Sequence, residues 1–183
     1  MGKKILVING SPRKQGNTEL LVDAFLEGVR ESGHEAHAFH LHEMNVHPCI
    51  GCLRGGKNPE SPCVQKDDMD KLYPLYQAAD VVVLASPMYY WGFTAQLKMV
   101  IDRLFAVTEA KIDTRNKESV LLIAAEGDDE ENNAPVRAYY ETLIKYLGWA
   151  DKGQLFAGGV YEIGDIKGRP VLEEAKKLGA SLR

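Results

Sequence analysis

The chain has 183 residues, 45% of them hydrophobic, and its 26 acidic against 22 basic side chains give a net charge of −4 at pH 7. This length suits one domain with a single core, so we expect residues 1–183 to form one unit. The acidic balance argues against nucleic-acid binding, which needs clustered positive charge, and no apolar run approaches the roughly 20 residues of a membrane span. The sequence shows no apolar signal-peptide region at its start, so a cytoplasmic location is expected.

Apolar runs alternate with amphipathic patterns along the chain, which predicts alternating strands and helices. In chain order we expect a strand at residues 5–8, a helix at 18–32, a strand at 35–41, a helix at 67–79, a strand at 81–85, a helix at 94–107, a strand at 120–125, a helix at 134–147, a strand at 155–160 and a helix at 171–181. Asp67 or Asp68 is expected to cap the second helix, and Pro74 to kink or break it. Pro135 suits the first turn of the fourth helix.

This order of elements predicts the fold class. Strands that read as continuous apolar runs are buried on both faces, as in a parallel sheet covered by helices. Right-handed crossovers between parallel strands then give a three-layer, doubly wound α/β fold with a five-stranded sheet. Residues 44–66 show little periodicity, and a loop of that length is usually functional or disordered.

The segment NGSPRKQGNTELL, residues 9–21, joins the first strand to the first helix. Ligands of open parallel sheets bind at the carboxyl ends of strands, and the free N–H groups at a helix start favour an anion. Ser11, Asn17 and Thr18 add side-chain donors, and Arg13 adds charge. The segment therefore predicts a phosphate cradle. The plainer alternative is a turn in which Thr18 only caps the helix.

The same loop differs from two better-known phosphate loops. It lacks the G-x-G-x-x-G pattern of a dinucleotide fingerprint, and Asn17 follows Gly16 where a P-loop has its lysine. Many hydrogen-bond donors with modest charge suit a single terminal phosphate, so we expect a monophosphate ligand.

A second segment, SPMYYWGFTAQLKMVIDR at residues 86–103, follows the third strand. Its three consecutive aromatic residues, at 89–91, come directly after a strand end and a proline, so we expect them to face a cleft. A flat aromatic ligand would stack there, and Gly92 would let the backbone approach it. The alternative is an aromatic cluster that belongs to the core.

The two segments together make the chain resemble the flavodoxin-like NAD(P)H-dependent FMN reductases and the iron–sulfur flavoproteins related to them, most strongly over residues 3–103. The resemblance implies a flavodoxin-like fold with strand order 2-1-3-4-5, one FMN per subunit, and a homodimer or homotetramer. It assigns cofactor binding, by position, to Ser11, Arg13, Gly16, Asn17 and Thr18 around the phosphate, and to Pro87, Met88, Tyr89, Tyr90, Trp91 and Gly92 along the ring. It also matches Lys98, Asp102 and Arg103 in the following helix, for which we expect a structural role as helix surface pairing or subunit contact. Lys98 and Asp102 are four residues apart, a spacing that permits an ion pair.

The long loop carries all three cysteines of the chain, Cys49, Cys52 and Cys63. Iron–sulfur members of the resembled family have a further cysteine just after the C-x2-C pair, where this chain has Gly55. A [4Fe–4S] cluster normally needs four thiolates, so we expect free thiols that pack as small hydrophobic side chains, and we assign no metal site. The alternatives are a cluster with a substitute ligand, zinc on three cysteines and His47, and a redox-active Cys49–Cys52 pair.

An acidic loop at residues 126–131, with five carboxylates among six residues, follows the fourth strand. A solvated helix start explains such a run, since carboxylates are favoured there. The functional alternative is that this negative charge disfavours a reduced, anionic flavin and lowers its potential.

The function expected from these segments is that of an FMN-dependent oxidoreductase. It would accept hydride from NAD(P)H and pass electrons to a flavin, a quinone or another small acceptor, with no catalytic side chain required because the flavin supplies the chemistry. The alternatives are a flavodoxin-like electron-transfer protein that serves a redox-protein partner, and a non-catalytic FMN-binding regulatory protein.

Overall fold

A parallel sheet of five strands lies at the centre of the fold, in the computed structural model that describes residues 2–183. The strand order is β2-β1-β3-β4-β5, and every neighbouring pair is parallel, which confirms the predicted fold class and strand order. The strands are β1 (Lys4–Asn9), β2 (Glu35–His40), β3 (Val81–Pro87), β4 (Glu118–Ala124) and β5 (Ala150–Ala157).

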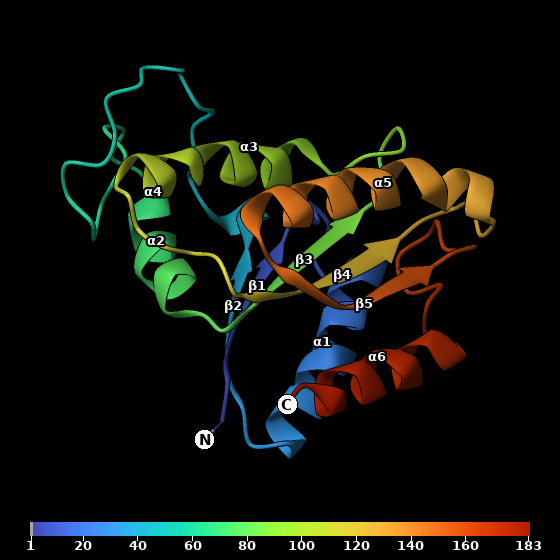
Figure 1. Cartoon of the computed structure of the whole chain (residues 1–183). Helices are drawn as coiled ribbons and strands as arrows, with labels where there is room; N and C mark the ends of the chain where they lie inside the picture. The colour runs from blue at the N-terminus through green and yellow to red at the C-terminus, as the bar shows by residue number, and fades with distance from the viewer. Residues whose placement is uncertain (1) are drawn as a thin grey trace.

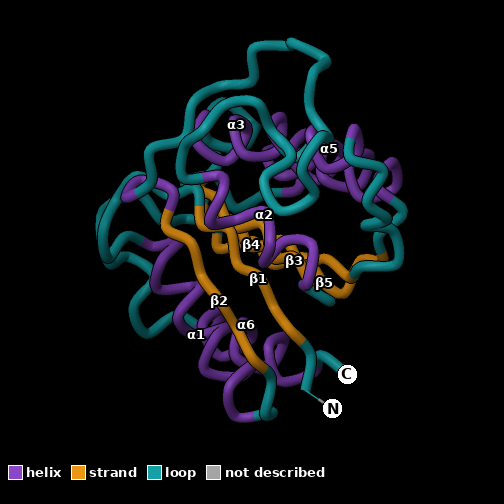
Figure 2. The backbone as a smooth tube through the Cα atoms, turned by 90° about the vertical axis from the view of Figure 1, so that its left-hand side faces the viewer, coloured by secondary structure: helices purple, strands orange, loops and turns teal. Residues whose placement is uncertain are grey.

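Helices cover both faces of this sheet (Figures 1 and 2). One face carries α1 (Asn17–Glu31) and α6 (Pro170–Ser181), and the other carries α2 (Met69–Ala78), α3 (Ala95–Arg103), α4 (Phe105–Glu109) and α5 (Glu130–Leu147). Side chains of β1 alternate between the two cores: Ile5 and Val7 pack on the α1 side, and Leu6 and Ile8 on the other. Burial on both faces is why the central strands read as unbroken apolar runs.

Helices α1 and α6 meet at two glycines, Gly28 and Gly179. A methyl group added at Gly28 would collide with the backbone of α6 at Lys176, and one added at Gly179 would collide with the backbone of α1 at Phe25. The two backbones therefore touch directly, and the position of α1 depends on α6.

Two prolines lie inside helices. Pro74 lies inside α2, which is not broken there, because Leu72, Tyr73 and Tyr76 are all buried around it and their packing outweighs the lost hydrogen bond. Pro135 lies at the sixth position of α5 and not in its first turn. The helix begins earlier than predicted because the Asp129 carboxylate accepts a hydrogen bond from the Asn132 N–H at 2.8 Å.

Other boundaries also shift. The helix predicted at residues 94–107 is divided into α3 and α4 at Leu104, whose N–H is shared between the carbonyls of Val100 and Ile101, each at 3.1 Å. Asp68 stands at the N-cap position of α2, but it is the Asp67 carboxylate that accepts the Met69 N–H, at 3.1 Å. Strand β5 starts five residues before the predicted one, because its first three residues are exposed at the sheet edge and carry no apolar signal.

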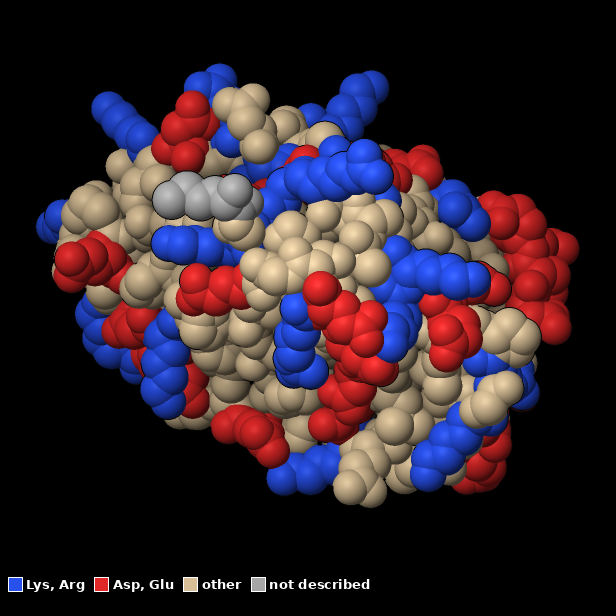
Figure 3. Space-filling model, turned by 90° about the horizontal axis from the view of Figure 1, so that it is seen from below, with Lys and Arg blue, Asp and Glu red and all other residues tan. Residues whose placement is uncertain are grey.

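The surface carries charges of both signs. Figure 3 shows lysine and arginine side chains interspersed with aspartate and glutamate over the face seen from below. None of the helices within residues 2–183 is long and apolar enough to cross a membrane.

Candidate functional site

A cavity of about 510 Å³ lies beyond the carboxyl ends of β1, β3 and β4. Strand β1 has β2 on one side and β3 on the other, so the chain changes direction across the sheet here, which is where such folds bind ligands. The volume falls within the roughly 300–1,000 Å³ that ligand pockets occupy. Its lining residues are Ser11, Arg13, Gly16, Asn17, Thr18, Pro87, Met88, Tyr89, Tyr90, Ala124, Ala125, Glu126, Val160 and Tyr161.

Nine of the eleven residues predicted to bind the cofactor line this cavity, and Trp91 and Gly92 do not. The two predicted segments thus lie at one site although they are some seventy residues apart in the chain. The described lining further includes residues at the ends of β4 and β5 that the sequence reasoning did not assign: Ala124, Ala125, Glu126, Val160 and Tyr161. The sequence could have indicated these residues, because parallel strands all place their carboxyl ends at the same edge of the sheet.

The start of α1 is open toward the cavity. Gly16 occupies the N-cap position, where it has no side chain to cap the helix, and Thr18 is only 1% exposed beside it. The N–H groups of a first helical turn have no partner within the helix, and together with the dipole they attract an anion. The alternative that Thr18 caps the helix is wrong, because Thr18 is the second residue of α1.

Asn17 lines the cavity with a side chain that is already bonded elsewhere. Its amide nitrogen donates to the Glu162 carbonyl at 2.8 Å, and its oxygen accepts from the N–H groups of Gly164 at 3.1 Å and Ile166 at 3.3 Å. These bonds fix the loop between β5 and α6. The Asn17 side chain is therefore a clamp for that loop, and what it presents to an anion is its backbone N–H at the start of α1.

Arg13 also contacts the loop between β5 and α6, since its guanidinium donates to the Tyr161 carbonyl at 2.8 Å. Only one of its nitrogens is used in this bond, so the others remain available for a phosphate. Two hydrogen bonds fix Ser11. Its N–H donates to the Asn9 side chain at 2.9 Å, and its hydroxyl accepts from the Arg13 N–H at 3.3 Å.

The aromatic segment forms a tight turn at the cavity mouth. Tyr89 and Gly92 exchange backbone hydrogen bonds at 3.0 and 3.1 Å, with Tyr90 and Trp91 at the two central positions. Both central residues have positive φ, 48° and 60°, which asparagine and glycine adopt easily and aromatic residues do not. Tyr90 is 97% exposed. The core-cluster alternative for these aromatic residues is therefore wrong.

Trp91 ties this turn to helix α5. Its indole N–H donates to the Asn132 side-chain oxygen at 3.3 Å, and the ring of Phe93 packs edge-on against Tyr139 with 5.2 Å between centroids. On the other side, the Thr94 N–H donates to the Ser86 hydroxyl at 3.1 Å. The turn is thus fixed between β3 and α5 in spite of its unfavourable backbone.

Only Glu126 of the acidic loop lines the cavity. Asp129 serves as the N-cap of α5, and hydrogen bonds from the backbone and side chain of Asn132 lower the pKa of its carboxyl. Glu130 pairs with Arg137 at 3.0 Å. Asp129 and Glu130 therefore have a structural explanation, and the functional alternative for the acidic run stays a prediction.

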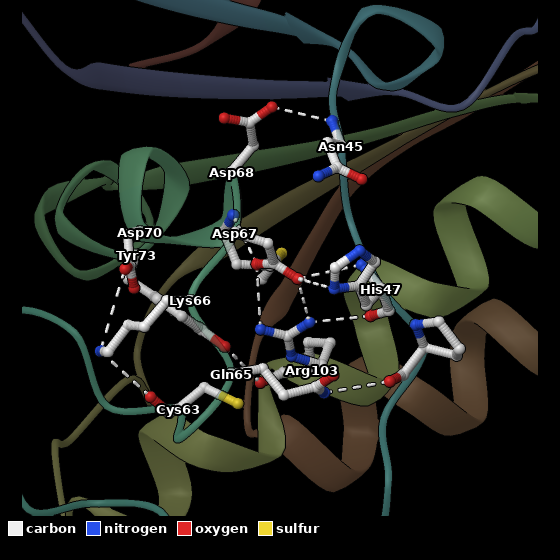
Figure 4. Close-up of polar contacts among 12 residues, drawn as sticks. Asn45, His47, Cys63, Gln65, Lys66, Asp67, Asp68, Asp70, Tyr73 and Arg103 are labelled. Carbon is white, nitrogen blue, oxygen red and sulfur yellow. Dashed lines mark hydrogen bonds and ion pairs between the residues drawn. The ribbon is translucent and has the colours of Figure 1, made fainter.

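The three cysteines lie away from this cavity, on the long loop that Figure 4 shows beside α3. All three are free thiols, and they line a separate cavity of about 40 Å³ together with Gly55. The Lys98–Asp102 pair predicted on α3 is present at 2.6 Å, whereas Arg103 is buried and does not lie on the helix surface.

A buried ion pair anchors the long loop at residues 44–66, which we call the cysteine loop. Arg103 and Asp67 are 1% and 0% exposed, and their closest atoms, Nη1 and Oδ2, lie 2.6 Å apart. The same Nη1 donates to the His47 carbonyl at 2.7 Å, and the Asp67 carboxylate accepts the His47 N–H at 2.9 Å (Figure 4). Burial raises the pKa of Asp67, but the hydrogen bonds from Arg103, His47 and Met69 outweigh it and hold that pKa below its ordinary value.

Comparison with known proteins places this site in context. Residues 3–157 match the model of a family described as NADPH-dependent FMN reductase. An iron–sulfur flavoprotein of Archaeoglobus fulgidus is 35% identical over 182 residues, which cover 98% of this chain and 78% of that protein. The iron–sulfur flavoprotein MJ1083 of Methanocaldococcus jannaschii is 40% identical over 100 residues, 55% of this chain and about half (51%) of that protein.

A solved structure, that of the NAD(P)H:quinone oxidoreductase from Methanothermobacter marburgensis, superimposes with a TM-score of 0.79 at 20% identity. The superposition covers 98% of this chain and 96% of that one. At this identity the likeness concerns the fold, and it agrees with the sheet order described above.

Proposed function

The chain belongs to the NADPH-dependent FMN reductase family, and from this premise we propose that it passes electrons from NAD(P)H to a flavin, a quinone or another small acceptor at the 510 Å³ cavity. Membership of this family makes it an oxidoreductase that uses FMN and NAD(P)H. The identity of the acceptor and the residues that hold FMN are the proposed part.

One observation carries the proposal: the two ends of a single cavity have different chemistry. At one end the uncapped start of α1, with Thr18 and Arg13, offers N–H and hydroxyl donors and one positive charge. At the other end lie Pro87, Met88 and the aromatic turn. FMN has a phosphate at one end and a flat ring at the other, and these residues fit it in that orientation.

The chain's own residues would bind and orient the cofactor. Bound FMN would supply the hydride and electron chemistry, as flavins do in proteins generally. Ser11, Gly16 and the backbone of Asn17 would hold the phosphate, and the carboxyl ends of β3 and β4 would support the ring. We assign no acid, base or nucleophile to a side chain.

The mouth of the cavity supports a small acceptor. Tyr90 stands at the rim and is almost fully exposed, so a planar molecule has access there. Such an open rim is also consistent with a second subunit, so we keep the homodimer or homotetramer as a proposal. The cytoplasmic location likewise stays a prediction.

The test is anaerobic mixing of the FMN-loaded protein with NADH or NADPH while flavin absorbance is recorded. We expect rapid bleaching by at least one nucleotide, followed by recovery of the absorbance when a quinone or free flavin is added. Bleaching only by a reduced redox protein would indicate the electron-transfer alternative, and no turnover with any donor would indicate a regulatory protein. Failure to bind FMN at all would contradict the proposal.

A further inference from the structure

The cysteine loop carries three of the four cysteines that a four-iron cluster needs. Cys49, Cys52 and Cys63 line one cavity, and Gly55 lines it as well. The spacing is regular, because Cys49, Cys52 and Gly55 follow one another at three-residue steps. Compact iron–sulfur motifs use the run C-x2-C-x2-C, and a four-iron cluster takes four thiolates. Gly55 therefore stands at the position of a missing thiolate.

Backbone geometry does not require glycine at position 55. Gly55 is not among the residues with positive φ, so a side chain suffers no conformational strain there. A Cβ atom would lie 3.2 Å from the Pro62 carbonyl oxygen and 3.4 Å from the Ala106 Cβ, which calls for a shift of a few tenths of an ångström. Its neighbour Gly56 is different, since it has a φ of +84° and a Cβ there would collide with the backbone of Glu109.

The cavity itself lacks a full ligand set for a cluster, since it has three cysteine side chains where a four-iron cluster takes four. A single ion is no better served, because within the described residues no three histidine, cysteine, aspartate or glutamate side chains are grouped to hold one. His47, the fourth ligand of the zinc alternative, does not line this cavity.

The loop has another anchor. Arg103 lies at the end of α3, and its guanidinium donates hydrogen bonds to the carboxylate of Asp67 and to the carbonyl of His47 (Figure 4). The hydroxyl of Tyr73 donates to the Arg103 carbonyl at 3.0 Å, and the Gln65 side chain donates to the Pro48 carbonyl at 3.0 Å. These contacts join the two ends of the loop to each other and to α2 and α3 without using a thiol.

We propose that this chain keeps the loop of an iron–sulfur protein without its cluster, that Gly55 in place of a fourth cysteine is the reason, and that the Asp67–Arg103 pair holds the loop in position. This distinguishes the chain from the relatives whose names include iron and sulfur.

Given the proposed function, the lack of a cluster also determines how electrons leave the cavity. An iron–sulfur cluster carries electrons one at a time, whereas hydride transfer from NAD(P)H delivers two. Without a cluster, the bound flavin would give its electrons directly to an acceptor that enters at the rim.

The experiment is anaerobic reconstitution with ferrous iron and sulfide, followed by desalting and measurement of iron and acid-labile sulfide per chain. The wild type should retain only background amounts. Gly55→Cys should retain about four of each, because the ligand set is then complete. Arg54→Cys is the matched control, since it also adds a fourth cysteine to the loop but at the adjacent position, and it should behave like the wild type.

Either of two results would overturn the inference: a stoichiometric cluster in the wild type, or a Gly55→Cys variant that binds no more iron than Arg54→Cys. If Gly55→Cys fails to fold, the wild-type iron content alone decides. Thermal unfolding with and without a metal chelator tests the anchor, and a lower melting temperature with chelator would contradict it. None of these readouts depends on NAD(P)H oxidation, so failure of the proposed function is seen separately.

Discussion

The hydroxyl of Thr94 donates a hydrogen bond to the carbonyl oxygen of Gly10 at 2.8 Å, and this bond joins the two loops that form the cavity. Gly10 belongs to the loop after β1, and Thr94 follows the aromatic turn and caps α3. Both residues are buried, and Gly10 approaches so closely that a Cβ atom would lie 2.6 Å from the Thr94 oxygen.

Replacing Thr94 with valine keeps its shape but removes this bond and the helix cap. We expect a loss of about 2–3 kcal/mol in the free energy of unfolding, because the buried Gly10 carbonyl loses its donor and α3 loses its cap. Urea unfolding of the protein would measure it. Thr94→Ser keeps the hydroxyl and should lose much less. An equal loss in both variants would show that the methyl group, and not the hydrogen bond, is what matters.

Thr18 and Asn17 should affect FMN binding in different ways. Thr18→Val should weaken FMN about tenfold, which corresponds to one lost hydrogen bond, and should leave riboflavin binding nearly unchanged because riboflavin has no phosphate. Asn17→Ala should weaken both ligands and lower the melting temperature, because it releases the loop at residues 162–166. Fluorescence titration with each flavin measures both constants. Equal losses for FMN and riboflavin in Thr18→Val would mean that the phosphate does not lie there.

The tight turn at Tyr90 predicts a stabilising substitution. Tyr90→Asn should raise the free energy of unfolding by roughly 1 kcal/mol, because asparagine tolerates positive φ and the exposed tyrosine ring loses almost no contacts. Tyr146→Asn is the control, since Tyr146 is also exposed but lies in α5 with no positive φ for asparagine to relieve. A gain in both variants would exclude relief of backbone strain as the cause.

The Asp67–Arg103 pair makes stability depend on pH in the acid range. Because the pKa of Asp67 is below its ordinary value of 3.8, its contribution is complete well above that pH and is lost as the pH falls through the lower, folded-state pKa. Asp67→Asn should therefore flatten the acid limb of the unfolding curve, and at neutral pH it should cost about 3–5 kcal/mol, since Arg103 is left as an unpaired buried charge.

The exposed pair of Asp113 and Arg115 gives the control for this prediction. Asp113→Asn should leave the stability at pH 7 nearly unchanged, because surface ion pairs contribute little. Equal costs for the two variants would remove the special role of the buried pair.

Glu126 is the acidic residue expected to influence the flavin. Glu126→Gln should raise the FMN midpoint potential by about 20–30 mV, because one nearby negative charge is worth on the order of 1 kcal/mol in solvated surroundings. Asp128→Asn with Asp129→Asn should shift it less, since neither residue lines the cavity. Spectroelectrochemical titration of the three proteins decides, and an unchanged potential in Glu126→Gln would end the electrostatic explanation.

The fold followed from the sequence because buried parallel strands have a local signature, and residues 81–85 show it as an unbroken apolar run. That the loops after β1 and β3 lie at one cavity could also be predicted from the sequence, since both follow parallel strands of one sheet. The role of Asn17 did not, because its partners at Glu162, Gly164 and Ile166 are far away in the chain and their backbone groups leave no trace in side-chain identity. The break at Leu104 was likewise hidden, because an apolar periodicity continues across it.

The close approach of α1 and α6 at Gly28 and Gly179 has a consequence for biosynthesis. Helix α6 leaves the ribosome after every other described element, yet it forms part of the support for α1, whose first turn faces the cavity. While α6 is still in the exit tunnel, α1 lacks the helix that packs against it. The Asn17 side chain then also lacks its hydrogen-bond partners in the loop between β5 and α6. Cofactor loading should therefore follow the emergence of α6, and a nascent chain stalled before residue 170 should bind FMN poorly even though both flavin-binding loops have already been made.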